Sequence, residues 1–271
     1  MLRLVSSNIL HGRSIVDGQV DTQRYVRALS ELQPTVLAMQ EVDRFQPRSD
    51  NTDQTAQIAA ALPGASWRFV PAIVGVPGEQ WRPATDNDVA SGHDLAPVDP
   101  SIPAYGTGLI TTLPVKSWHV IRVQPFRFRS PVFIPGINKW MMIDDEPRVC
   151  IAAVVAYEGE LMTVAGTHAS FVPGWNVPQI RRITRALSKL PGPHILLGDL
   201  NLPAPVPALV TRWKALATGL PTFPAPNPKM QLDHALLHDP AHQFNRSNHP
   251  ITARVEHLPF SDHRALVVEI D

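Results

Sequence analysis

Residues 194–202, His-Ile-Leu-Leu-Gly-Asp-Leu-Asn-Leu, place two polar side chains directly after a short apolar run. The pattern predicts a buried strand over residues 195–197 that stops at a glycine and leaves Asp199 and Asn201 at its end. Because strand residues alternate sides, Asp199 and Asn201 point to one side while Leu200 faces the core. A carboxylate and a carboxamide held there can orient a water, a phosphate oxygen or a cation. The structural alternative is an Asp-x-Asn turn that caps the strand.

Polar residues also stand at the ends of other predicted strands. Residues 2–9 form a first strand that delivers Asn8, and residues 35–40 form a buried strand that is followed by Glu41. This repetition indicates one shared site. The residues that we assign to this candidate site are Asn8, Glu41, His168, Asp199, Asn201, Asp233, Asp262 and His263.

The side-chain types in this set favour phosphoryl chemistry assisted by a divalent cation. Carboxylate and carboxamide oxygens suit a hard cation such as Mg²⁺ or Mn²⁺. Zinc is disfavoured, because the chain has no cysteine cluster and its predicted helices carry no histidine pair. Two histidines near carboxylates can transfer protons. A cation with two such histidines fits phosphate-ester hydrolysis, in which the metal neutralises charge and a base activates water.

Other catalytic signatures are missing from the sequence. It contains no Gly-x-Ser-x-Gly elbow, no phosphate-cradling Gly-x-x-x-x-Gly-Lys loop and no Gly-x-Gly-x-x-Gly fingerprint. Taken singly, the candidate residues have ordinary explanations: Asp262 could be a turn residue and Asp233 a hydrogen-bonded strand residue. His119, His234 and His238 are interpreted as surface or core residues.

Composition bounds the class of protein. The 271 residues carry 24 basic and 24 acidic side chains, so the basic excess typical of a protein that grips a long nucleic acid is missing, although a local patch could hide in a neutral total. The single cysteine, Cys150, excludes an internal disulfide and is expected in the core. The sequence shows neither a signal peptide nor a spanning helix, and a cytoplasmic location is expected.

Helix and strand patterns alternate from end to end, which predicts a single α/β domain over residues 1–271. Asp21 is expected to cap a helix that Pro34 ends, and Asn176 to cap another. Two more helices are predicted over 53–62 and 206–216. Further strands are predicted over 67–74, 105–112, 115–123, 148–156, 161–167, 232–237, 252–258 and 265–270.

Two long connections interrupt this pattern. Residues 76–103 are rich in Pro, Gly and Asp and are expected to form a lid or an insertion. Residues 124–145 mix aromatic, basic and methionine side chains between prolines. They could form a substrate-facing loop, or a satellite hydrophobic cluster beneath a loop.

The order of the motifs resembles the endonuclease/exonuclease/phosphatase superfamily, which includes deoxyribonuclease I, neutral sphingomyelinases and inositol-polyphosphate 5-phosphatases. The resemblance spans nearly the whole chain and implies a four-layer sandwich of two mixed β-sheets flanked by helices. It rests on Ser-Asn-Ile-Leu-His-Gly (7–12), Met-Gln-Glu-Val-Asp (39–43), Gly-Thr-His (166–168), Gly-Asp-Leu-Asn (198–201), Gln-Leu-Asp-His (231–234) and Ser-Asp-His-Arg (261–264).

The resemblance also implies a role for each position. Glu41 would be the principal ligand of one or two Mg²⁺ or Mn²⁺ ions, with Asn8 and Asp262 completing the shell directly or through water. Asp199 and Asn201 would orient the attacking water and the phosphate.

The remaining implied roles concern protons and phosphate contacts. His263, steadied by Asp233, would be the general base or a phosphate-stabilising group. His168 would hydrogen-bond the phosphate or assist the leaving group.

Departures from the family pattern indicate which branch of the superfamily the sequence resembles less. Leu10 stands where abasic-site endonucleases carry a carboxylate, and these enzymes also lack the Thr167-His168 pair. Gly166 replaces an Asn that commonly precedes Thr-His, so a supporting hydrogen bond is expected to be missing.

The sequence therefore predicts a Mg²⁺- or Mn²⁺-dependent phosphoesterase that acts on a phosphodiester. Three alternatives stay open: a DNA or RNA nuclease, a sphingomyelinase-like lipid phosphodiesterase or one acting on a small metabolite, and a binding module that has kept the fold without the chemistry.

Overall fold

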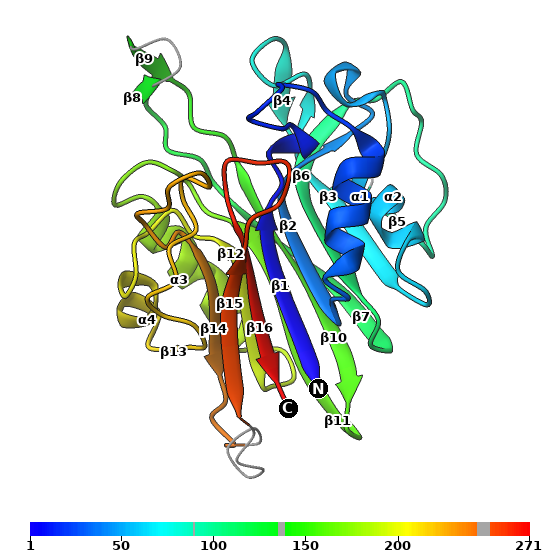
Figure 1. The fold of residues 1–271 in the computed structure, drawn as a ribbon, viewed down its shortest axis with the longest axis vertical. Helices are drawn as coiled ribbons and strands as arrows, with labels where there is room; N and C mark the ends of the chain where they lie inside the picture. The colour runs from blue at the N-terminus through cyan, green and yellow to red at the C-terminus, as the bar shows by residue number, and fades with distance from the viewer. Residues whose placement is uncertain (89, 135–138, 243–249) are drawn as a thin grey trace.

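The computed structural model describes residues 1–88, 90–134, 139–242 and 250–271, and within these residues the chain forms two large mixed β-sheets (Figure 1). The first sheet has the strand order β15-β16-β1-β2-β6-β3-β4, and β5 also pairs with β3. Its strands are β1 (Leu2–Asn8), β2 (Val36–Arg44), β3 (Ser66–Gly75), β4 (Trp81–Pro83), β5 (Ser91–Gly92), β6 (Ala104–Thr111), β15 (Ile251–Glu256) and β16 (Ala265–Ile270).

The second sheet has the strand order β13-β14-β12-β11-β10-β7. β11 and β12 are parallel, whereas β12 and β14 are antiparallel, with Asp199 directly opposite Asp233. Its strands are β7 (Val115–Val123), β10 (Arg148–Tyr157), β11 (Glu160–His168), β12 (His194–Asp199), β13 (Lys214–Ala215) and β14 (Asp233–His238).

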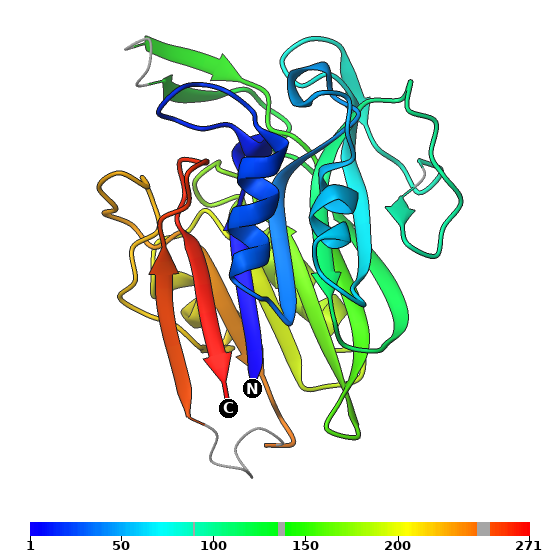
Figure 2. The same ribbon diagram turned by 45° about the vertical axis from the view of Figure 1, so that its right-hand side comes forward.

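Helices cover the outer face of each sheet, as Figures 1 and 2 show, and this is the predicted four-layer sandwich. Helices α1 (Thr22–Glu31) and α2 (Gln54–Ala60) cover the first sheet, and α3 (Asn176–Leu187) and α4 (Val206–Thr211) cover the second. The largest core cluster lies between the sheets and includes Leu4, Ala38, Val164, Leu197 and Leu266. None of the helices in the described ranges is long and apolar enough to cross a membrane.

Helix capping agrees with the sequence at one helix and not at another. The Asp21 side chain accepts a hydrogen bond from the Arg24 backbone nitrogen, which confirms the predicted cap of α1. The cap of α3 was assigned wrongly, because Trp175 is the capping residue and Asn176 is the first helical residue. The Asn176 side chain instead donates to the Asn201 carbonyl oxygen at 2.8 Å, which ties α3 to the loop after β12.

Two predicted boundaries are also wrong. β2 does not stop before Glu41 but continues to Arg44, and its register against β6 shifts between Met39 and Val42. Glu41 lies in this bulge with a φ of 57°, so the ladder is interrupted where the carboxylate leaves the sheet. The helix predicted over 206–216 ends at Thr211, because Arg212 adopts a left-handed conformation and β13 follows.

Both long connections contain strands that the sequence did not indicate. Residues 76–103 include β4 and β5, which pair with β3. Residues 124–145 include β8 (Ser130–Ile134) and β9 (Lys139–Ile143), which form an antiparallel hairpin. This hairpin stands out from the end of the sandwich opposite the chain termini (Figures 1 and 2). At the base of the hairpin the ring of Phe126 contacts the rings of Phe128 and Trp175. The expected hydrophobic cluster is therefore present at the base, while the rest of residues 124–145 includes the hairpin.

Candidate active site

A pocket of about 340 Å³ lies where β11 and β12 end and β2 bulges. Five of the candidate residues predicted from the sequence line it, together with aromatic and charged neighbours from other elements. Its lining residues are Glu41, Tyr105, Asp144, Glu146, Arg148, His168, Phe171, Asp199, Asn201, Phe223, Leu232 and His263.

Asp199 is the centre of the candidate site. Its Oδ2 accepts a hydrogen bond from Asn8 Nδ2 at 3.2 Å, and its Oδ1 accepts one from the Asn201 backbone nitrogen at 2.9 Å. The Nε2 atoms of His168 and His263 lie 3.6 and 3.7 Å from the same Oδ2. Burial raises the pKa of Asp199 to about 7, because a carboxylate loses hydration there. The carboxyl group therefore titrates near neutral pH between two imidazoles.

His263 is paired with a second carboxylate. Asp233 is fully buried at the start of β14, and its Oδ2 lies 2.8 Å from His263 Nδ1. Phe223 covers the imidazole at a centroid distance of 4.8 Å. Burial lowers the pKa of His263, but Asp233 and Asp199 raise it more, to about 10. His263 is therefore an imidazolium at neutral pH.

His168 has the opposite character. Its Nδ1 lies 3.2 Å from Nη1 of Arg148, a side chain that is itself buried at the start of β10. Burial lowers the pKa of His168 well below its ordinary value, and the charge of Arg148 lowers it further. The pocket thus holds one charged and one neutral imidazole on either side of Asp199.

Asn8 and Glu41 meet beside Asp199. Asn8 Nδ2 donates to Glu41 Oε1 at 3.0 Å, and Asn8 Oδ1 accepts from the Leu10 backbone nitrogen at 3.1 Å. Asn8 therefore turns its amide nitrogen, not its oxygen, toward the carboxylates. Burial raises the pKa of Glu41, and the negative charge of Asp262 raises it further.

Asp262 is the one candidate residue that neither lines this pocket nor makes a side-chain contact to it among the described residues. Its carbonyl oxygen accepts a hydrogen bond from the Ala225 backbone nitrogen at 2.6 Å. Its side chain is half-buried, and its charge acts on both Glu41 and His263.

The donor set fits a hard divalent cation better than a metal with many protein ligands. In the described part of the chain, no three His, Cys, Asp or Glu side chains form a ready-made metal cluster. Mg²⁺ needs only one or two carboxylates because it keeps several waters. Glu41 and Asp262 supply two carboxylates whose mutual repulsion raises the pKa of Glu41, and a cation between them would relieve that repulsion.

Several lining residues were not recognised in the sequence. Tyr105 comes from β6, Glu146 precedes β10, and Arg148 opens β10. Arg148 opens a strand, as Asp233 does, but it lies in none of the sequence motifs. Because β10 runs antiparallel to β11, with Cys150 opposite Thr167, its first residues lie beside His168. The position of Arg148 beside His168 follows only from this strand pairing. The acidic run Asp-Asp-Glu before β10 was a sequence signal that could have pointed to Glu146.

Comparison with known proteins identifies the family and the fold. The profile of the Endonuclease/Exonuclease/phosphatase family matches residues 5–263. No curated protein matches the chain.

Solved structures share the fold at low sequence identity. A family protein from Leptotrichia buccalis has a TM-score of 0.62 at 15% identity, with 100% of both chains covered. One from Beutenbergia cavernae has a TM-score of 0.61 at 19% identity, covering 99% of this chain and 71% of that one. A mannosyl-6-phosphatase from Bacteroides thetaiotaomicron has a TM-score of 0.59 at 15% identity, with both chains covered over 100%. At such identities the likeness concerns the fold alone.

Proposed function

Since the chain belongs to the endonuclease/exonuclease/phosphatase family, we propose that it is a Mg²⁺- or Mn²⁺-dependent phosphodiesterase. Members of this family are phosphoester hydrolases and generally use divalent metals. The observation that carries the proposal is the position of Asp199 Oδ2, 3.6 Å from the neutral His168 and 3.7 Å from the charged His263.

Each of these groups has a task that follows from its charge. Asp199, with a pKa of about 7, orients the attacking water and takes its proton, because a base works best when its pKa lies near the working pH. His263 is an imidazolium and donates to a phosphate oxygen rather than accepting a proton. His168 and Asn201 offer neutral N–H donors to the same phosphate. Asp233 keeps the His263 ring in place.

Glu41 and Asp262 would hold the metal ion, with Asn8 fixing the Glu41 carboxylate. The bound ion would neutralise charge on the phosphate oxygens.

The charges in the pocket favour a diester over a monoester. Four carboxylates, those of Glu41, Asp144, Glu146 and Asp199, surround a volume whose cations are Arg148 and His263. A monoester dianion carries one more negative charge than a diester, and like charges at short range are costly in a partly dehydrated site. The Bacteroides mannosyl-6-phosphatase makes monoester hydrolysis the competing activity to test.

The test compares bis(p-nitrophenyl) phosphate with p-nitrophenyl phosphate in Mg²⁺, in Mn²⁺ and in chelator. We expect faster diester hydrolysis that chelator abolishes, and losses of at least about 10² in turnover for D199A and H263A. H119A, on the edge strand β7, is the matched control. Full activity in chelator, or unchanged turnover in D199A, would refute the proposal, and a preference for the monoester would make the protein a phosphatase.

The β8–β9 hairpin supports a second candidate, a lipid phosphodiesterase. Phe128, two residues before β8, and Met142 of β9 are 71% and 56% exposed, and Asp144 of the pocket directly follows β9. Replacing residues 128–143 by a short turn should then reduce sphingomyelin hydrolysis far more than chromogenic diester hydrolysis. Equal losses on both substrates would remove this candidate.

A further inference from the structure

The neutral total charge hides a strong separation along the chain. Residues 161–232 contain seven Lys or Arg residues and a single acid, Asp199, which is a net charge of +6. The other residues carry 17 basic and 23 acidic side chains, a net charge of −6. The positive segment contains α3 and α4, which lie together on the outer face of the second sheet (Figure 1).

The outward face of α3 is almost entirely cationic. Ile180, Ile183 and Leu187 are buried against the second sheet. The exposed residues of the helix are Pro178, Arg181, Arg182 and Arg185. The apolar side chains of α3 are thus buried against the sheet, and its solvent-exposed face consists mainly of guanidinium groups.

Three arginines surround a hollow between α3 and the end of α4. The hollow has a volume of about 360 Å³ and is lined by Arg181, Thr184, Arg185, Val210, Thr211 and Arg212. Arg181 Nε donates to the Val210 carbonyl oxygen at 3.1 Å, which fixes that side chain at the rim. Among the described residues, no carboxylate pairs with these three arginines. Exposed arginines elsewhere do have such partners, for example Arg27 with Glu31 and Arg82 with Asp88.

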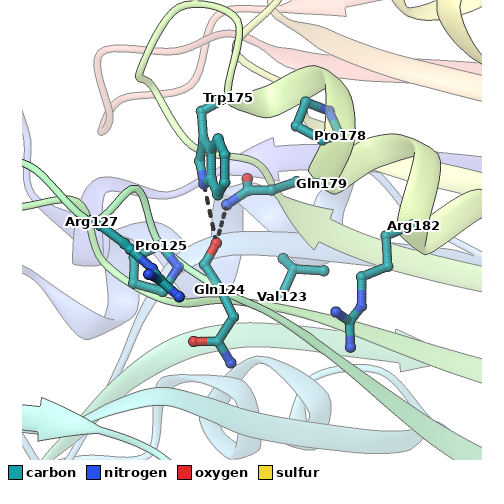
Figure 3. Close-up of a pocket in the computed structure, with 8 residues that line it drawn as sticks. All are labelled: Val123, Gln124, Pro125, Arg127, Trp175, Pro178, Gln179 and Arg182. Carbon is teal, nitrogen blue, oxygen red and sulfur yellow. Dashed lines mark hydrogen bonds between the residues drawn. The ribbon is translucent and has the colours of Figure 1, made fainter.

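A second cleft beside α3 also contains arginines. It has a volume of about 450 Å³, and Figure 3 shows Arg127 and Arg182 on its opposite sides. Trp175 and Gln179 donate to the Gln124 carbonyl oxygen at 3.2 and 2.8 Å and hold the cleft together.

This cleft is connected to the catalytic pocket by hydrogen bonds. The Phe126 backbone nitrogen, next to Arg127, donates to Asp145 Oδ2 at 2.7 Å. The other oxygen of Asp145 accepts from Arg148, which lines the catalytic pocket. Arg182 lies next in sequence to Arg181 of the hollow. The two arginine sites therefore share helix α3, and the cleft is linked through Asp145 to Arg148 of the candidate active site.

We infer that this basic face, formed by Arg127, Arg181, Arg182, Arg185 and Arg212, binds the phosphate backbone of a nucleic acid at a site separate from the catalytic pocket. Guanidinium groups bind phosphate oxygens in a bidentate manner, which favours arginine over lysine for this task. A polymer of phosphates can occupy the hollow and the cleft together, whereas a single phosphate fills one of them. Binding at this face does not require the proposed hydrolysis.

An anionic membrane fits the same face less well. Interfacial helices bury an apolar stripe in the bilayer, but the apolar stripe of α3 faces the second sheet. Leu209 of α4 is 71% exposed and is the only large apolar residue of α3 and α4 that stands out among the described residues. The arginines also line hollows, which a flat bilayer surface fills poorly.

The test measures binding of fluorescein-labelled single-stranded and double-stranded oligonucleotides by anisotropy, between 50 and 200 mM salt. R181A/R185A/R212A should weaken binding on the order of tenfold at 50 mM salt. Three lost phosphate contacts should also reduce the slope of log K against log salt by about 2 for single strands. R27A/R82A/R254A removes three ion-paired arginines outside the face and should leave affinity and slope unchanged. Melting temperatures of both variants check folding.

Three results would overturn the inference: no oligonucleotide binding by the unaltered protein at 50 mM salt, equal losses in the two triple variants, or loss of binding to phosphatidylserine vesicles with oligonucleotide binding intact. Chromogenic diester hydrolysis is measured in parallel on the same samples. A protein that binds oligonucleotides through this face without hydrolysing any diester would refute the proposed function and leave this inference standing.

Discussion

Nη1 of Arg148 lies 3.2 Å from Nδ1 of His168, and both side chains are buried. A guanidinium can only donate hydrogen bonds, so Nδ1 must be the acceptor. Because His168 is neutral, its single ring hydrogen is then on Nε2, which faces Asp199 Oδ2 at 3.6 Å. Because Nε2 carries this hydrogen, the Asn201 amide nitrogen at 3.2 Å is a neighbour rather than a donor to the ring, and one of its two hydrogens is donated to the Ala169 carbonyl oxygen. His168 is therefore built to donate one hydrogen bond into the pocket.

Substituting His168 tests this assignment. Glutamine carries an amide N–H at nearly the position of Nε2, so H168Q should keep turnover within about tenfold of the unaltered protein, whereas H168A should lose about 10²–10³, the usual cost of one lost donor. The measurement is kcat on bis(p-nitrophenyl) phosphate with Mg²⁺. If H168Q is as inactive as H168A, the imidazole transfers a proton, and the donor role is wrong.

Arg148 should control the protonation of His168. Removing the charge in R148M should move the pKa of His168 upward, toward its ordinary value of 6.5, while R148K keeps a charge nearby and should keep the pKa low. The ring proton shifts of His168, followed by NMR between pH 5 and 8, measure this. Identical titration in both variants would mean that burial and the charge of His263, and not Arg148, determine the pKa of His168. R148M also leaves Asp145 and Glu146 without their buried partner, at a cost of about 3–5 kcal/mol in the free energy of unfolding, so both variants are compared below their melting temperatures.

The local part of the candidate site could be predicted from the sequence. Asn8 follows a roughly alternating segment, and Asp199 and Asn201 follow a short apolar run, and both patterns predict a strand with polar residues at its end. The structure brings them together with Glu41 and with His263. The four-layer fold was implied by the family resemblance that the motif order carries. Three motifs end β1, β11 and β12, one lies at the bulge of β2, and two lie at the start of β14 and directly before β16.

The non-local part could not be predicted. Arg148 lies at the pocket only because β10 pairs antiparallel with β11, and this pairing cannot be predicted from the sequence of either strand alone. The bulge at Glu41 shifts the register of β2 against β6. The apolar pattern around it gives no sign of the shift, so the sequence did not predict it. The basic face was hidden because net charge averages over surfaces that point in different directions.

Asp199 should make folding stability depend on pH. Its pKa is raised from 3.8 to about 7, so between these values the folded protein holds a proton that the unfolded chain has released. This carboxyl group therefore lowers the free energy of unfolding progressively as the pH rises from about 4 to 7. D199N removes the buried charge and should be more stable than the unaltered protein by on the order of 1–3 kcal/mol at pH 8, with the difference vanishing near pH 4. Urea denaturation at the two pH values measures it, and D99N, at an exposed loop, is the control. A D199N protein that is less stable at both pH values would contradict the shift.

We expect that Gly166 cannot be replaced by a larger residue without loss of stability, because the two sheets approach each other closely at this position. A Cβ atom added to Gly166 of β11 would lie 2.8 Å from Cβ of Ala38 on β2, too close for two carbon atoms. The asparagine that commonly precedes Thr-His in the superfamily would therefore force the sheets apart here, so the glycine is a consequence of this contact and not only a lost hydrogen bond. G166A should cost about 1–3 kcal/mol in the free energy of unfolding. Because A38G removes the opposing Cβ, the double variant G166A/A38G should be more stable than the sum of the single effects by at least about 0.5 kcal/mol. Strictly additive effects in urea denaturation would show that the sheets adjust freely at this point.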